Sequence, residues 1–100
     1  MYSKCVVVRN PSGLHARPAS EFVAKAKGFQ SKISIRRPGD DAFIGNAKSI
    51  IIMLSMGVGQ GESVEIAADG PDEHQAVEAL VTLVDSGFGE ICPTILAQER

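Results

Sequence analysis

One histidine, His15, is the strongest candidate for chemistry in this sequence. It follows the turn-forming run Asn10–Gly13, stands where a helical pattern begins, and has Arg17 two residues further on. The first backbone N–H groups of a helix have no partner within the helix and carry the positive end of its dipole. Such an end binds anions, phosphate above all. A phosphoryl group on a ring nitrogen of His15 would face these N–H groups and the Arg17 guanidinium.

The neighbours of His15 favour a carrier of the phosphoryl group over an enzyme that hydrolyses it. No second histidine and no pair of acidic residues lies near His15 in the sequence, although hydrolysis needs an acid or base of this kind. We therefore expect a passive carrier without a metal ion or organic cofactor, whose protein partners supply the catalysis. A small phosphatase acting alone is the weaker alternative. Lys25 and Lys27 are either solvated helix charges or the border of a docking face for an acidic partner.

The composition indicates one small globular domain. The chain has 100 residues, a normal share of apolar residues and a net charge of −2. With no basic run and no tryptophan, nothing in it indicates nucleic-acid binding. The longest apolar run, Ile50–Leu54, is far too short to cross a bilayer, and the N-terminus lacks the pattern of a secretory signal, so we expect a soluble cytoplasmic protein. Cys5 and Cys92 lack metal-ligand spacing and are expected to be free thiols.

The residues after His15 have the pattern of a helix over 16–27. Their apolar positions recur at spacings of three and four and form one stripe: Ala19, Phe22, Val23 and Ala26. Pro18 suits the first turn, where its missing N–H costs nothing, and Gly28 is expected to end the helix as a left-handed cap. On the other face Glu21 and Lys25 are spaced for an ion pair.

The rest of the chain alternates strand and helix patterns. Strands are predicted at 4–9, 32–36, 42–44 and 63–67, and further helices at 48–53, with Asn46 as N-cap, and from Pro71–Glu73 to about Ser86. The order β-α-β-β-α-β-α predicts an α+β fold, an open-faced two-layer β-sandwich in which three helices cover one face of a four-stranded antiparallel sheet. We expect one domain over residues 1–88 and a tail, 89–100, that is either weakly helical or disordered.

A second point of interest is the start of the short apolar helix. Ser49 lies in its first turn, where the hydroxyl either bonds backbone N–H groups or is a site of regulatory phosphorylation. A short helix cannot bury every side, so one or two of its apolar residues are expected to form an exposed docking patch: Ile50, Ile51 and Leu54. The spaced glycines of Gly57–Gly61 follow a helix and precede a strand, which is the wrong order for a nucleotide-binding loop.

The motif Gly13–Ala19 resembles that of the HPr family, the histidine-containing phosphocarriers of the bacterial sugar phosphotransferase system. The similarity continues through Asn46–Ile50 and covers nearly the whole chain up to Phe88. The family has an open-faced β-sandwich of four antiparallel strands and three helices, in agreement with the pattern above. The ending Asp85–Phe88 also resembles the nitrogen-related branch, NPr, so the choice between the sugar and nitrogen branches stays open.

The resemblance implies that His15 accepts a phosphoryl group from phosphorylated enzyme I, whose donor is phosphoenolpyruvate, and passes it to a IIA protein or domain. By the family pattern the group sits on Nδ1 of His15, near the Arg17 side chain and the backbone amides of Ala16 and Arg17. Ser49 matches the serine that HPr kinase/phosphorylase modifies in many bacteria. The positions that correspond to the family's docking face are Ile50, Ile51 and Leu54, with Lys25 and Lys27 in place of a docking lysine that is absent at Ala24.

The resemblance also implies a monomer. A competing hypothesis is a regulatory binding protein that is controlled through Ser49 and acts mainly by protein–protein contacts.

Overall fold

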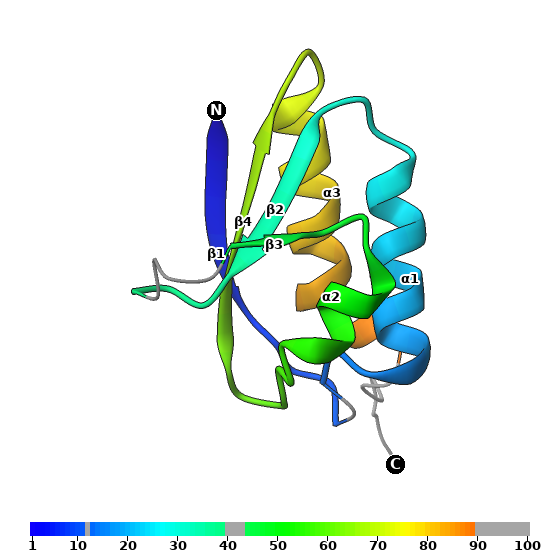
Figure 1. The fold of residues 1–100 in the computed structure, drawn as a ribbon. Helices are drawn as coiled ribbons and strands as arrows, with labels where there is room; N and C mark the ends of the chain where they lie inside the picture. The colour runs from blue at the N-terminus through cyan, green and yellow to red at the C-terminus, as the bar shows by residue number, and fades with distance from the viewer. Residues whose placement is uncertain (12, 40–43, 90–100) are drawn as a thin grey trace.

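A four-stranded antiparallel sheet packs against three helices in the computed structural model, which describes residues 1–11, 13–39 and 44–89 (Figure 1). The elements along the chain are β1 (Tyr2–Val7), α1 (Ala16–Lys27), β2 (Lys32–Arg36), β3 (Gly45–Asn46), α2 (Ile50–Ser55), β4 (Ser63–Asp69), α3 (Glu73–Asp85) and the short 3₁₀ helix η1 (Gly87–Gly89). The strands lie side by side in the order β1-β4-β2-β3. The predicted fold class is therefore confirmed.

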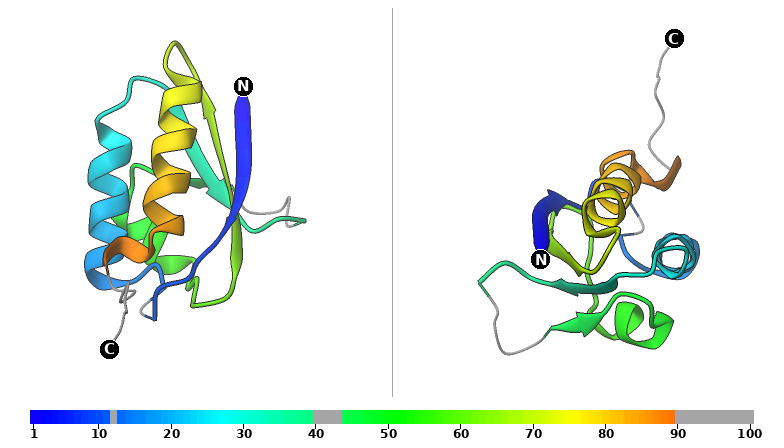
Figure 2. Two further views of the ribbon diagram at one scale, coloured as in Figure 1. Left: turned by 180° about the vertical axis from the view of Figure 1, so that it is seen from behind. Right: turned by 90° about the horizontal axis from the view of Figure 1, so that it is seen from above.

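The core lies between the sheet and the helices. Figure 2 shows α1 and α3 against the same side of the sheet, and no helix of the described residues covers the opposite side. Alternate residues of β4 are buried on the helix side: Val64, Ile66 and Ala68. Ile33 and Ile35 of β2 pair with Ala68 and Ile66 and are buried with them. Phe22 of α1 and Leu80 of α3 complete the core from the helix layer.

The helix predicted after His15 is confirmed at both ends, but its C-terminal cap is not the predicted one. Gly28 has a φ of −75°, so it is not a left-handed cap. Its N–H reaches the Lys25 carbonyl oxygen at 3.1 Å, and the next N–H, of Phe29, reaches Ala26 at 3.2 Å. The helix therefore ends by tightening its last turn instead of reversing the backbone hand.

The prediction of Asn46 as a helix N-cap is wrong. Asn46 lies in β3, and the backbone N–H of Ala47 still donates to Ile33 of β2 at 3.0 Å. The chain therefore stays on the sheet through residue 47, and the N-cap of α2 is Ser49. The Asn46 side chain instead accepts a hydrogen bond from the N–H of Lys48 at 2.9 Å and forms the turn between strand and helix.

Other element boundaries shift by a few residues. The first strand begins at Tyr2 and ends at Val7, and α3 begins at Glu73, so that Pro71 lies before the helix. Residues 42 and 43 of the predicted third strand lie outside the described residues, and the strand observed there is Gly45–Asn46. Residues 90–100 of the predicted tail also lie outside them, as does Cys92, whereas Cys5 is an exposed free thiol.

Candidate functional site

His15 is the N-cap of α1, and its side chain is exposed. Its backbone is extended (φ −125°, ψ 162°), and the side chain makes no capping hydrogen bond to the helix. The N–H groups of Ala16 and Arg17 are among those for which helix geometry provides no intrahelical acceptor, while Pro18 has no N–H. The first turn contains no acidic residue. This helix end therefore keeps its positive potential for an external anion.

The loop before His15 is held from behind by the segment that follows α2. Gly13 has a φ of +64°, and a Cβ there would lie 2.5 Å from the Val58 carbonyl oxygen and 2.8 Å from the Gly59 Cα. Only glycine fits this conformation and this close contact. The Leu14 N–H donates to the Val58 oxygen at 2.9 Å, and the buried side chain of Asn10 donates to the Gly13 carbonyl at 2.8 Å.

The supporting segment, residues 57–62, is in turn held by a charged network. The Arg37 Nε donates to Glu62 Oε1 at 2.9 Å, and its Nη2 donates to the Met56 carbonyl at 2.7 Å. The second Glu62 oxygen accepts from the Gly59 N–H at 2.7 Å. The Gly59 N–H and then the Arg37 guanidinium hold the pKa of the Glu62 carboxyl below its usual value. The end of α2 and the support of the His15 loop thus share one anchor.

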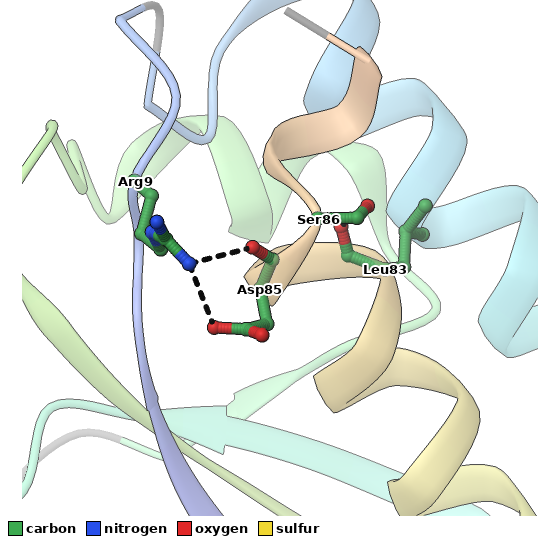
Figure 3. Close-up of polar contacts among 4 residues, drawn as sticks. All are labelled: Arg9, Leu83, Asp85 and Ser86. Carbon is green, nitrogen blue, oxygen red and sulfur yellow. Dashed lines mark hydrogen bonds and ion pairs between the residues drawn. The ribbon is translucent and has the colours of Figure 1, made fainter. Parts of the chain in front are cut away.

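The C-terminal end of α3 lies at the same end of the molecule as the start of α1 (Figure 1). Figure 3 shows Arg9, in the loop after β1, with its Nη1 facing Asp85: the distances are 3.5 Å to the carbonyl oxygen and 3.5 Å to Oδ1. Gln60 donates to the Arg9 carbonyl at 3.0 Å. Arg9 therefore connects the loop that leads to His15 with both α3 and the supporting segment.

The Arg17 side chain is 72% exposed and forms an ion pair with Glu21, with Nε 3.0 Å from Oε2. The sequence predicted that Glu21 would pair with Lys25, one turn towards the C-terminus, so this prediction is wrong. The structure instead brings the carboxylate to the site arginine.

An apolar surface lies on α2 beside α1. Ile51 is 74% and Leu54 43% exposed, while Ile50 is half-buried. A shallow groove of about 270 Å³ separates the two helices and is lined by Ser20, Val23, Ala24, Lys27 and Ile50. The exposure agrees with the expected docking patch. Lys25 and Lys27 are both exposed on α1, and Lys27 lines the groove. Their role in docking stays a prediction.

Ser49 is half-buried at the N-cap of α2, where its Oγ accepts a hydrogen bond from the Ile52 N–H at 3.4 Å. The hydroxyl therefore bonds a backbone N–H group of the helix, which is one of the two roles predicted for it. The distance is near the upper limit for a hydrogen bond.

Sequence reasoning missed three participants: Glu21, Arg37 and Glu62. The spaced glycines 57, 59 and 61 were the one available signal for the supporting segment, since Gly57 and Gly61 both have positive φ.

Within residues 1–11, 13–39 and 44–89, no group of three histidine, cysteine or acidic side chains could hold a metal ion. No helix in this described part is long and apolar enough to cross a membrane.

The chain is similar to known proteins over most of its length. Residues 2–86 match the family described as "PTS HPr component phosphorylation site". The chain is 45% identical over 84 residues to the phosphocarrier protein HPr of Haemophilus influenzae, a match that covers 84% of this chain and 95% of that protein. It is 39% identical over 85 residues to the HPr-like protein Crh of Halalkalibacterium halodurans, covering 85% and 98% of the two chains. The crystal structure of an HPr from Thermoanaerobacter tengcongensis superposes with a TM-score of 0.84 at 44% identity, covering 91% of this chain and 99% of that one.

Proposed function

Since the chain belongs to the HPr family of phosphocarrier proteins of the phosphotransferase system, we propose that His15 takes a phosphoryl group from phosphorylated enzyme I and passes it to IIA proteins. The observation that carries this proposal is the first turn of α1, which has an exposed histidine as N-cap and no acidic residue. We place this role in the cytoplasm, with the protein acting as a monomer.

The transfer needs no group beyond the two reacting proteins. The Nδ1 lone pair of His15 attacks the phosphorus of the donor's phosphohistidine and a P–N bond forms on His15. The donor's P–N bond breaks with its electron pair returning to the donor ring, which takes up a proton as His15 gives up the one on Nε2. The backbone N–H groups of Ala16 and Arg17 and the Arg17 guanidinium stabilise the phosphoryl oxygens. The reverse sequence with a IIA histidine passes the group on, so the protein turns over without hydrolysing it.

The apolar surface of α2 is the proposed docking face for both partners. α2 lies beside α1 (Figure 1) and carries Ile51 and Leu54, which are 74% and 43% exposed, while Lys25 and Lys27 are exposed positive charges on α1. Buried apolar contacts surrounded by charges are the usual composition of a transient interface.

The test of phosphorylation uses the two histidines of the chain against each other. Incubation with enzyme I, Mg²⁺ and phosphoenolpyruvate should add one acid-labile phosphate to the wild-type protein and none to His15→Ala. His74→Ala is the matched control, because His74 is also exposed but stacks on Tyr2, with ring centroids 4.2 Å apart. Undiminished labelling of His15→Ala would exclude the proposal.

Docking is tested with two exposed isoleucines. Ile51→Ser should raise the KM of enzyme I for the carrier about tenfold, as expected for an apolar contact near the centre of an interface. Ile44→Ser is the control, since Ile44 is 61% exposed and precedes β3. Both variants should keep the free energy of unfolding within about 0.5 kcal/mol. Equal KM values for the two variants would mean that α2 is not the docking face.

A second candidate function is regulation through Ser49. The similarity to an HPr-like protein Crh supports this alternative, as does the weak 3.4 Å hydrogen bond that a phosphate on Ser49 would replace. Incubation with HPr kinase/phosphorylase and ATP should then give acid-stable phosphate on the wild-type protein and none on Ser49→Ala. No acid-stable label on the wild-type protein would rule this function out.

A further inference from the structure

The ion pair between Arg17 and Glu21 runs against the preferences of an isolated helix. Arg17 places a positive charge in the first turn, at the positive end of the helix dipole. The pair also has the acidic residue C-terminal to the basic one, which is the weaker of the two orientations at this spacing. Pairing of Glu21 with Lys25 would have been the better choice for the helix. Helix stability therefore does not explain why the carboxylate lies against the site arginine.

The Arg17–Glu21 ion pair is weak enough for Arg17 to exchange the carboxylate for another anion. Its side chains are 72% and 38% exposed, and the contact is between Arg17 Nε and one oxygen of Glu21 at 3.0 Å. An exposed pair at this spacing changes an equilibrium constant by only about twofold. A phosphoryl group brings close to two negative charges near neutral pH, so it competes well for the same guanidinium.

We propose that Glu21 is a positioning residue for the phosphoryl site, an inference that rests on the proposed function of His15. In the unphosphorylated carrier the Glu21 carboxylate holds the Arg17 guanidinium on α1 at its first turn. When His15 is phosphorylated, Arg17 exchanges this carboxylate for the phosphoryl oxygens. The cost of breaking the pair makes the phosphorylated form less stable, and so keeps the group ready for transfer.

The experiment measures the phosphorylation equilibrium of Glu21→Gln, which removes the charge and keeps the shape. Carrier, catalytic enzyme I and a fixed ratio of phosphoenolpyruvate to pyruvate are brought to equilibrium, and the phosphorylated fraction is read by ³¹P NMR. The ratio of phosphorylated to free Glu21→Gln should be about two to three times that of the wild type. A change in fold stability common to both forms would not shift this ratio.

Two further variants test the route through Arg17. In the Arg17→Gln background, Glu21→Gln should have little effect, because there is no guanidinium left to release. Glu78→Gln is the control for loss of an ion-paired glutamate elsewhere, since Glu78 of α3 pairs with Lys4 at 2.7 Å, and it should leave the ratio unchanged.

The inference is overturned if Glu21→Gln does not move the ratio, if it moves it equally in the Arg17→Gln background, or if Glu78→Gln has the same effect. In each of these cases the wild-type protein is still phosphorylated, and the proposed function stands. Absence of any label on the wild type would instead refute the proposed function itself.

Discussion

The N-termini of α1 and α3 differ in charge: that of α3 is acidic, whereas that of α1 is not. At α3, Asp72 is the N-cap and Glu73 lies in the first turn. Asp72 accepts hydrogen bonds from the N–H groups of Gln30 and Ser31 at 2.9 and 3.0 Å, and Glu73 accepts one from the Gly70 N–H at 3.2 Å. At α1 the N-cap is His15 and the first turn holds no acidic residue; neither N-cap side chain, His15 or Asp72, makes a capping hydrogen bond to its own helix.

The difference shows what each helix start is for. The carboxylates of α3 place negative charge at the positive helix end and tie it to the loop before β2, which is what stability alone favours. The start of α1 gives up these contributions and carries Arg17 instead. A local departure from the stabilising pattern is expected at a functional site, and here it leaves donors and positive charge for a phosphoryl group.

The largest expected effect comes from making the first turn of α1 acidic like that of α3. Arg17→Glu removes the charge-assisted bond to the phosphoryl group and adds a repulsive charge, so phosphoryl acceptance should fall by about 10- to 100-fold or more, corresponding to about 1.5–3 kcal/mol. Stability should stay within about 1 kcal/mol, because the gain from the dipole is offset by repulsion from Glu21. Transfer rates from enzyme I and urea unfolding measure the two effects. Unchanged transfer would mean that the two helix ends do not differ in function.

A second prediction concerns how the start of α1 is held without capping side chains. Gly13→Ala places a Cβ 2.5 Å from the Val58 carbonyl oxygen at a φ of +64°. We expect a loss of at least about 2 kcal/mol in the free energy of unfolding, from backbone strain together with overpacking. Gly39→Ala is the control for positive φ alone, since nothing lies within 4 Å of its added Cβ. If both variants lose the same stability, the contact with the 57–62 segment is not what holds the loop.

The third prediction makes the start of α3 more like that of α1. Asp72→Asn removes the charge that three donors share: the N–H groups of Gln30 and Ser31 and the Ser31 hydroxyl. The urea midpoint at pH 7 should fall, while phosphoryl transfer through His15 should not change. The opposite pattern is expected of His15→Ala, which should keep the urea midpoint and lose transfer. If either variant changed both the urea midpoint and phosphoryl transfer, the two helix ends would not have separate roles.

The smallest effect is a dependence of stability on acid pH. The Ser31 hydroxyl and the Gln30 N–H lower the pKa of Asp72, and the Gly70 N–H lowers that of Glu73. A depressed pKa in the folded state adds stability that is fully present above the ordinary carboxyl pKa of about 4. This stability is lost as the pH falls through the lower folded-state pKa. The urea midpoint of the wild type should drop from pH 5 to about pH 2, and Asp72→Asn should show a flatter drop. Parallel curves would contradict the assignment.

Much of the site could be predicted from local pattern. The apolar stripe of Phe22 and Val23, together with Pro18, placed the start of α1 at His15 or one residue later, and the structure agrees. The same reasoning failed at Asn46, a residue with good capping chemistry that stays in the sheet because Ala47 bonds to Ile33. A local signal states what a residue is suited to do, and a hydrogen bond from a distant strand can override it.

The sequence by itself determined the element order, the place of His15 at a helix start and the presence of Arg17 beside it. These features depend on residue spacing within one helical turn or one strand, and that spacing is given directly by the sequence. Only the tertiary structure decided that Val58 backs Gly13, that Arg37 and Glu62 anchor that support, and that Glu21 turns to Arg17 instead of Lys25. Contacts between distant segments follow from how the layers pack, which periodicity does not encode. Equal spacing along one helix likewise does not say which of two basic residues Glu21 pairs with.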